Sequence, residues 1–376
     1  MLIASFAAHA ASKWDIGFNE PFVAGYMQQV GQCEQCPTNS YPANPSMVAS
    51  RLLDLVGTQH VGVYREIIPL RALRPTSTTN RYETAIDILS IYSNYNANLV
   101  ITFGLPIPDW MSQTGSRDQI MPVDDASWTV LKNSLSQETG DFVRALWNSP
   151  RINRTWLQER VYFEGFNEFD SLLTVQNTRD HASPQRAADL QNGIQTVLNS
   201  YGLPVHTLMP SVVGVYAGYS TQPPNLIAKY MSDYYAAGGT GLPNAHIYVN
   251  ANASQGASFM LAGLRAQVVA ISNALPASMK GQLYIGETGA ADRLAPYCTA
   301  DSQASTLDIA ERDGYYASVA MDPTIASRTH TILFWRLMNL PIAQLPQCDA
   351  LYGVVHDDNS GYKGVGTNLF NYLKQP

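Results

Sequence analysis

The chain has 376 residues and a formal net charge of −7 at pH 7, and 14% of its residues are charged. It contains no long acidic or basic runs, which argues against nucleic acid and an anionic membrane surface as partners. Beyond the first ten residues, no apolar run is long and uninterrupted enough to span a bilayer. We expect a neutral, hydroxyl-rich ligand, and we expect a monomer.

The first residues resemble the tail of a secretory signal. Residues 2–10 are mostly apolar and end in Ala8-His9-Ala10, an A-x-A pattern typical of a cleavage site. An ordered N-terminal extension is the alternative for residues 1–11. The expected location is secreted or periplasmic.

Four cysteines are present, and the first two have a C-x-x-C spacing that also occurs in redox and zinc sites. The other two lie far away in the sequence, so disulfides in an exported protein are the favoured interpretation. Three pairings remain open among Cys33, Cys36, Cys298 and Cys348.

Strand patterns recur along the whole chain. The first is predicted at residues 14–18, followed by a long loop that contains Asn19-Glu20-Pro21 and the first cysteine pair. Further strands are predicted, in chain order, at residues 60–65, 98–105, 161–168, 205–209, 245–250, 282–289 and 329–335.

Helices are predicted between these strands. Asn44-Pro45 and Ser183-Pro184 each place a capping side chain before a proline of the first turn. The predicted helices cover residues 44–57, 80–96, 125–147, 183–202, 224–237, 258–275, 305–320 and 368–373. This alternation, without an internal linker, predicts a parallel sheet closed into a single (β/α)8 barrel over residues 12–376, with long loops at its C-terminal face.

Polar and aromatic residues gather at the carboxyl ends of the predicted strands, where barrels of this class build their sites. His246 lies on the same strand face as Tyr248 and Asn250, by the two-residue period. The residues predicted at strand ends are Arg65, Asn167, Glu168, Tyr248, Asn250, Glu287 and Trp335.

Two of these residues are carboxylates that follow apolar strands. Glu168 ends the fourth strand and Glu287 ends the seventh. Glycoside cleavage needs one carboxylic acid to protonate the leaving oxygen and a second carboxylate to attack the anomeric carbon or activate water. The pair therefore indicates glycosidase chemistry.

The same residues carry a family resemblance. Glu164-Gly-Phe-Asn167-Glu168, together with a glutamate that ends the seventh strand, resembles clan A of the retaining glycoside hydrolases. Residues 163–170 and Leu105-Pro-Ile-Pro-Asp-Trp110 are similar to segments of the β-xylosidase and α-L-iduronidase family. Phe169 stands where that family usually has proline, so its substrate is not carried over.

The resemblance implies that Glu168 is the general acid/base and Glu287 the nucleophile. Glu168 then needs a raised pKa, whereas Glu287 has to be ionised, with charge from Arg65 and a hydrogen bond from Tyr248. Asn167 is expected to bind the sugar 2-hydroxyl.

Several residues have two interpretations. Trp335 either offers an apolar face to a pyranose ring or packs in the core, and Trp110 and Trp128 either line sugar subsites or pack under loops. Asn19-Glu20-Pro21 is interpreted as a decoy of the acid/base motif or a wall of the site. Glu164 is interpreted as a supporting residue whose partner the sequence does not identify, with Arg65 as one candidate. His246 is interpreted as a structural or subsite residue rather than a metal ligand.

The predicted function is a retaining glycoside hydrolase that cleaves a β-linked glycan by double displacement, without cofactor or metal. Endo action on a polysaccharide is preferred because of the long loops after the strands. An exo-acting β-glycosidase and a non-catalytic carbohydrate-binding barrel are the alternatives. The motifs G-x-S-x-G, H-E-x-x-H, G-x-G-x-x-G and G-x-x-x-x-G-K-[ST] are absent from the sequence, which disfavours a serine hydrolase, a metalloprotease and a nucleotide-binding enzyme.

Overall fold

The computed structural model describes residues 15–33, 43–249, 255–292, 306–337 and 366–375. Eight strands form one parallel sheet in the order β5-β4-β3-β2-β1-β10-β7-β6. The strands are β1 (Ile16–Asn19), β2 (Val63–Pro69), β3 (Asn98–Gly104), β4 (Val161–Glu164), β5 (His206–Leu208), β6 (Asn244–His246), β7 (Leu283–Thr288) and β10 (Thr329–Trp335).

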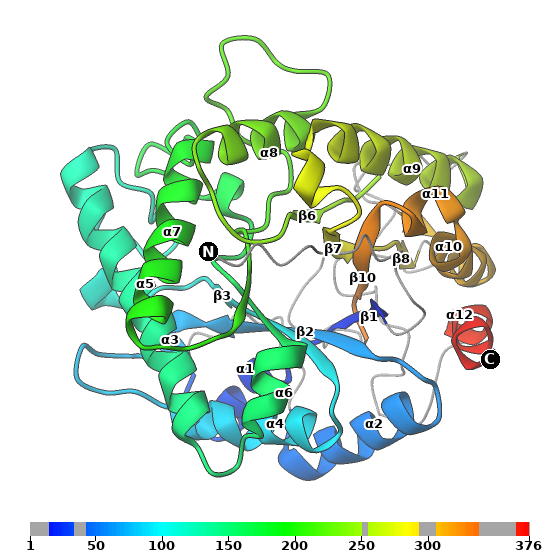
Figure 1. Cartoon of the computed structure of the whole chain (residues 1–376), viewed down its shortest axis with the longest axis horizontal. Coiled ribbons are helices and arrows are strands. Elements are labelled where there is room, and N and C mark those ends of the chain that lie inside the picture. Colours follow the sequence, from blue (N-terminus) through cyan, green and yellow to red (C-terminus); the bar gives the residue numbers. More distant parts are fainter. Residues whose placement is uncertain (1–14, 34–42, 250–254, 293–305, 338–365, 376) are drawn as a thin grey trace.

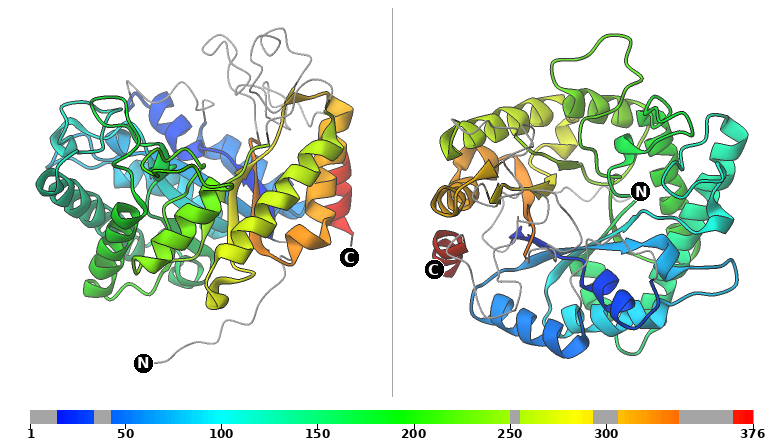
Figure 2. Two further views of the ribbon diagram at one scale, coloured as in Figure 1. Left: turned by 90° about the horizontal axis from the view of Figure 1, so that it is seen from above. Right: turned by 180° about the vertical axis from the view of Figure 1, so that it is seen from behind.

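The two edges of this sheet meet between β5 and β6. Isolated parallel bridges join Leu208 to Leu242 and Val212 to Ala245. Helices surround the strands on all sides (Figure 1), and the view from behind shows the same ring (Figure 2). The chain is therefore a (β/α)8 barrel, as the alternation of strands and helices predicts.

The helices that alternate with the strands follow the predicted pattern. Asn44 caps α2 by accepting the Met47 N–H at 2.9 Å, and Ser183 caps α7 by accepting the Arg186 N–H at 3.2 Å. These helices are α2 (Pro45–Gly57), α4 (Tyr82–Asn94), α5 (Asp125–Asn148), α7 (Pro184–Ser200), α8 (Leu226–Ala236), α9 (Ala257–Ala274), α10 (Ile309–Met321) and α12 (Thr367–Lys374).

Shorter elements lie between these strands and helices. They are helices α3 (Leu70–Leu73), α6 (Arg154–Arg160) and α11 (Pro323–Ala326), 3-10 turns η2 (Asp109–Met111), η3 (Phe169–Ser171) and η4 (Ala277–Met279), and a small parallel pair of β8 (Ala291–Asp292) and β9 (Thr306–Leu307).

The prediction of a long loop after the first strand is wrong for the first half of that segment, where the structure has helix α1 (Phe22–Gln29). Phe22, Val23 and Met27 are buried in the core between the sheet and the helices. The Val23 N–H donates to the Glu66 carboxylate at 3.1 Å, which satisfies a free amide in the first turn. Tertiary contacts therefore stabilise a helix that is too short to be recognised by periodicity.

The second strand was predicted four residues too short at its end. Every residue of β2 pairs with a residue of β3, which extends the strand to Pro69. Arg65 consequently lies within the strand rather than at its end. Its side chain is buried inside the molecule.

The fourth and sixth strands end earlier than predicted, at Glu164 and His246. Asn167, Glu168 and Tyr248 therefore lie in the segments that follow the strands. These segments are still at the carboxyl ends of the strands, so the predicted face of the barrel is unchanged.

Some predictions fall outside the described residues. These include residues 1–11, Asn250 and the three cysteines Cys36, Cys298 and Cys348, so the disulfides and their pairing stay a prediction. Among the helices of the described ranges, none has the length and apolar character needed to cross a membrane.

Candidate active site

A cavity of about 270 Å³ opens at the carboxyl ends of the strands. Its walls come from the carboxyl ends of β2, β3, β7 and β10 and from the segments that follow β1, β3, β4 and β10, which lie far apart in the sequence. The lining residues are Pro21, Ala24, Ile67, Pro69, Gly104, Leu105, Asn167, Glu168, Ser171, Leu172, Glu287, Trp335 and Arg336.

Arg65 lies at the floor of this site and is fully buried. Its guanidinium donates to both oxygens of Glu164, at 2.9 and 3.0 Å, and to Glu287 Oε1 at 2.8 Å. Burial alone would lower the pKa of Arg65, but the charges of Glu164 and Glu287 outweigh burial and raise it. The partner of Glu164 is thus the candidate Arg65, and Arg65 also supplies the expected charge next to Glu287.

Two asparagines complete the coordination of the guanidinium. Arg65 donates to Asn19 Oδ1 at 3.0 Å and to Asn167 Oδ1 at 2.7 Å. The Asn19 amide also donates to the Gly286 carbonyl at 2.8 Å, next to Glu287 in β7. Asn19 is fully buried and holds Arg65 and β7 together, whereas Pro21 of the same motif lines the cavity.

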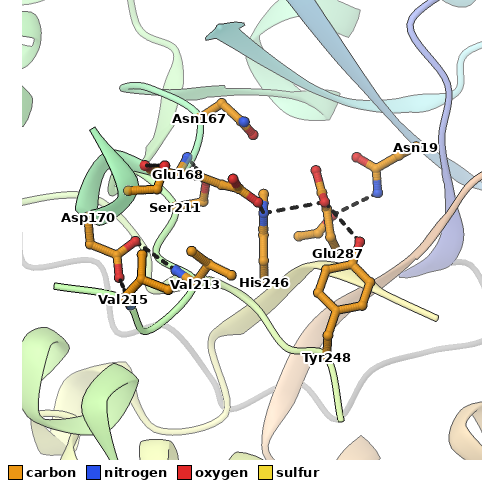
Figure 3. Close-up of polar contacts among 12 residues, drawn as sticks. Asn19, Asn167, Glu168, Asp170, Ser211, Val213, Val215, His246, Tyr248 and Glu287 are labelled. Carbon is orange, nitrogen blue, oxygen red and sulfur yellow. Dashed lines mark hydrogen bonds and ion pairs between the residues drawn. The ribbon is translucent and has the colours of Figure 1, made fainter. Parts of the chain in front are cut away.

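Glu287 is held by donors on both carboxylate oxygens. Arg65 donates to Oε1 at 2.8 Å. The Tyr248 hydroxyl donates to Oε2 at 3.0 Å (Figure 3). Only 6% of the Glu287 side chain is exposed. The expected hydrogen bond from Tyr248 is confirmed, and the carboxylate has a fixed orientation.

Glu168 is more accessible, with 31% of its side chain exposed. Its Oε1 lies 3.0 Å from His246 Nδ1, and the same nitrogen lies 3.4 Å from Glu287 Oε2. His246 is fully buried. The imidazole therefore lies between the two carboxylates and contacts both (Figure 3).

The pKa shifts of the two glutamates are opposite to those expected. Burial raises the pKa of Glu287, although His246 and Arg65 act in the other direction. Burial also acts to raise the pKa of Glu168, but the hydrogen bond and charge of His246, together with Arg65, outweigh it and lower the pKa. The hydrogen bond from His246 to Glu168, and the charge of Glu168 that raises the pKa of Glu287, account for the difference.

Glu168, His246 and Glu287 also form the one cluster among the described residues whose ligand atoms suit a metal ion, all within 4.8 Å of one another. Arg65 and Tyr248 already donate to the two oxygens of Glu287. A cation at this position would have to displace these donors and lie near a guanidinium. The arrangement fits carboxylates organised by hydrogen bonds better than a metal centre.

The three tryptophans occupy different places. Trp335 ends β10, lines the cavity and has the Arg336 guanidinium 4.6 Å from its ring centroid. Trp110 is 36% exposed in η2 and does not line the cavity, and its indole N–H donates to the Arg74 carbonyl at 3.2 Å. Trp128 is buried against Phe169, so packing is its role.

The sequence reasoning missed Ser211 and Asp170. Ser211 Oγ accepts the Glu168 N–H at 2.8 Å, and Asp170 accepts three backbone N–H groups of residues 213–215. Asp170 belongs to residues 163–170, the segment that contains the predicted acid/base. Its partners, however, lie 43 or more residues away in the sequence. No local pattern indicates such contacts.

No family model and no curated protein matches this chain. Similar solved structures are GH5_18 from Bifidobacterium longum subsp. longum ATCC 55813 in complex with Manβ1-4GlcNAc (TM-score 0.64, 11% identity, 96% of this chain and 77% of that chain) and the Ignisphaera aggregans GH53 catalytic domain (TM-score 0.62, 9% identity, 100% of both chains).

A third similar structure is PbGH5A, a glycoside hydrolase family 5 enzyme from Prevotella bryantii B14 (TM-score 0.61, 12% identity, 99% of this chain and 100% of that chain). At such low identities the likeness establishes the fold that these proteins share with this chain. Function has to be argued from the site itself.

Proposed function

We propose that the protein is a clan A glycoside hydrolase that cleaves a β-linked glycan with retention of configuration. The main support is the spacing of Glu168 and Glu287, whose nearest ligand oxygens lie within 4.8 Å of each other. Retaining enzymes place their carboxyl groups about 5 to 5.5 Å apart, whereas inverting enzymes need roughly 6.5 to 9.5 Å to admit a water molecule. The short spacing favours the retaining mechanism.

In this proposal Glu287 is the nucleophile. Its carboxylate attacks the anomeric carbon to form a glycosyl ester, and the bond from that carbon to the leaving oxygen breaks. Arg65 and Tyr248 hold the carboxylate in one orientation and favour its ionised form. Such fixed donors position the nucleophile before the reaction begins.

Glu168 is the proposed general acid/base. It gives its proton to the leaving oxygen in the first step and removes a proton from water in the second. Its lowered pKa in the free protein suits the second step. A bound glycan covers the exposed part of Glu168 and removes its water, which raises its pKa and favours the protonated form required in the first step.

Substrate class and mode of action belong to the proposal as well. The matched GH5_18 structure holds Manβ1-4GlcNAc, a β-linked disaccharide. The matches include GH5 and GH53 proteins, which supports clan A rather than the finer likeness to the β-xylosidase and α-L-iduronidase family. Endo action on a polysaccharide is supported by the long segments 105–124 and 165–183 beside the cavity, with exo action as the alternative.

The test is the release of reducing ends from a panel of β-linked oligo- and polysaccharides. Wild type is compared with Glu287→Gln, and the anomer of the first product is followed by NMR. We expect release by wild type alone, with retained configuration, and internal cleavage of long chains. Binding by both proteins without release would support the non-catalytic barrel, and release of terminal sugars only would support exo action.

We also propose that the protein is exported, because of the signal-like residues 2–10 and the four cysteines. Fractionation of cells that express the complete gene, followed by thiol labelling, tests this proposal. Free thiols in a purely cytoplasmic protein would contradict it.

A further inference from the structure

The backbone at Glu168 has a left-handed conformation, with φ 48° and ψ 53°. Residues with a side chain adopt this conformation only when their surroundings hold it. Here it turns the chain so that Asn167 faces Arg65 while Glu168 faces His246. The position of the Glu168 carboxyl therefore depends on this turn.

One residue of the segment after β5 contacts both peptide groups around the turn. The Glu168 N–H donates to Ser211 Oγ at 2.8 Å, and the Phe169 N–H donates to the Ser211 carbonyl at 2.8 Å. The Ser211 N–H donates to the Phe166 carbonyl at 3.1 Å. Ser211 is fully buried, so water does not replace these partners.

The segment that carries Ser211 is held in turn by the segment that carries Glu168. Asp170 is fully buried, and its carboxylate accepts the N–H groups of Val213 at 2.8 Å, Gly214 at 2.7 Å and Val215 at 2.9 Å. Figure 3 shows Ser211, Asp170 and their partners beside Glu168. Hydrogen bonds thus run in both directions between the two segments.

We propose that Ser211 is a positioning residue for Glu168, and that Asp170 keeps Ser211 in place. This inference rests on the proposed function, because it assumes that Glu168 is the general acid/base. Without the Ser211 hydroxyl, the Glu168 N–H loses its acceptor in a buried place and the turn relaxes. A general acid works only within hydrogen-bond reach of the oxygen that it protonates, so a small displacement reduces proton transfer.

The experiment compares two aryl β-glycosides of the sugar that is active in the panel described above. A phenyl leaving group needs a proton from the acid, whereas a dinitrophenyl leaving group departs without one. Since kcat/KM reports the first step, we expect Ser211→Ala to lower kcat/KM for the phenyl glycoside by about 10- to 100-fold, because general acid catalysis contributes roughly that much or more. For the dinitrophenyl glycoside we expect a loss of less than about threefold, since that step needs no acid.

Two further variants separate positioning from general damage. Ser211→Thr keeps the hydroxyl and is expected to restore most of the phenyl glycoside activity. Ser136→Ala makes the same change at a buried serine of helix α5, in the outer ring of helices. It is expected to leave both rates within about twofold, since Ser136 touches no group of the site. Asp170→Asn, which loses acceptor capacity toward residues 213–215, is expected to show the same dependence on the leaving group as Ser211→Ala.

Equal losses on both glycosides in Ser211→Ala and Asp170→Asn, or no loss on either, would overturn the inference. The same holds if Ser211→Thr is as impaired as Ser211→Ala. These results leave the proposed function intact as long as Glu168→Ala loses the phenyl glycoside activity. If Glu168→Ala retains that activity, the proposed function itself fails.

Discussion

Arg65 of β2 is the side chain that links the carboxyl ends of three other strands of the barrel. It donates to Asn19, Glu164, Asn167 and Glu287, which come from β1, β4, the segment after β4 and β7. A buried guanidinium needs such partners, because removing it from water without them is unfavourable. The site and the stability of the barrel therefore share one residue.

The contribution of this network to stability is tested by Glu164→Gln. The substitution leaves the buried Arg65 with one carboxylate instead of two, so we expect the free energy of unfolding to fall by about 3 kcal/mol, the lower end for a broken buried ion pair. Urea denaturation measures the change. Glu83→Gln is the control, because Glu83 is 81% exposed in a surface ion pair with Arg151 and should lose less than about 1 kcal/mol. Equal losses in the two variants would contradict the role assigned to Glu164.

The roles of the two glutamates are tested by azide. Glu168→Ala keeps the nucleophile, so azide attacks the glycosyl ester and we expect a β-glycosyl azide. Glu287→Ala leaves the opposite face of the sugar open, so azide attacks the substrate directly and an α-glycosyl azide is expected. NMR of the products distinguishes the two anomers. The same anomer from both variants would show that the roles are assigned wrongly.

The pH dependence follows from Tyr248. Its hydrogen bond lowers the pKa of Glu287, whereas burial raises it. Tyr248→Phe removes the donor, so the pKa of Glu287 rises and a smaller fraction of the carboxyl is ionised at a given acidic pH. The acidic limb of the kcat/KM profile is therefore expected to move to higher pH. An unchanged limb would mean that another group controls it.

At the scale of elements, capping residues mark where helices begin. Asn44 and Ser183 accept backbone N–H groups in the first turns of α2 and α7, as their positions before proline predict. Helix α1 is different, because its start is satisfied by Glu66 of β2 rather than by a local cap. Such a helix is found only when the strand beside it is known.

The cap of α2 gives a test at this scale. Asn44→Ala removes the acceptor of the Met47 N–H, and we expect a loss of about 1 kcal/mol in the free energy of unfolding. Asn44→Asp keeps the acceptor oxygen and should be close to wild type. Thermal denaturation of the three proteins measures the difference. A full loss in Asn44→Asp would show that the side-chain cap is not the cause.

At the scale of the whole molecule, closure of the barrel brings the two carboxylates together. Glu168 follows β4 and Glu287 lies in β7, and these strands are on opposite sides of the gap between β5 and β6 in the sheet order. The bridges from Leu208 to Leu242 and from Val212 to Ala245 join those sides. His246 follows this junction and contacts both carboxylates.

The candidate site was predictable where it depends on strand order. Glu168 and Glu287 follow apolar strands, and in a parallel barrel all strands end at one face, so their proximity follows from the alternation of strands and helices. Trp110 follows a strand in the same way, yet it does not line the cavity. A position after a strand places a residue on the face, but the course of the loop determines whether its side chain reaches the centre.

The sequence by itself determined the barrel, the capped helices and the carboxylate pair, because these depend on periodicity and on signals a few residues apart. The tertiary structure decided that Asn19 holds Arg65 and β7 together, that Ser211 contacts the turn at Glu168, and that the pKa of Glu287 is raised while that of Glu168 is lowered. Each of these depends on burial and on distances between residues far apart in the chain. Such distances and burial exist only once the strands have closed into a barrel, so local sequence patterns do not predict them.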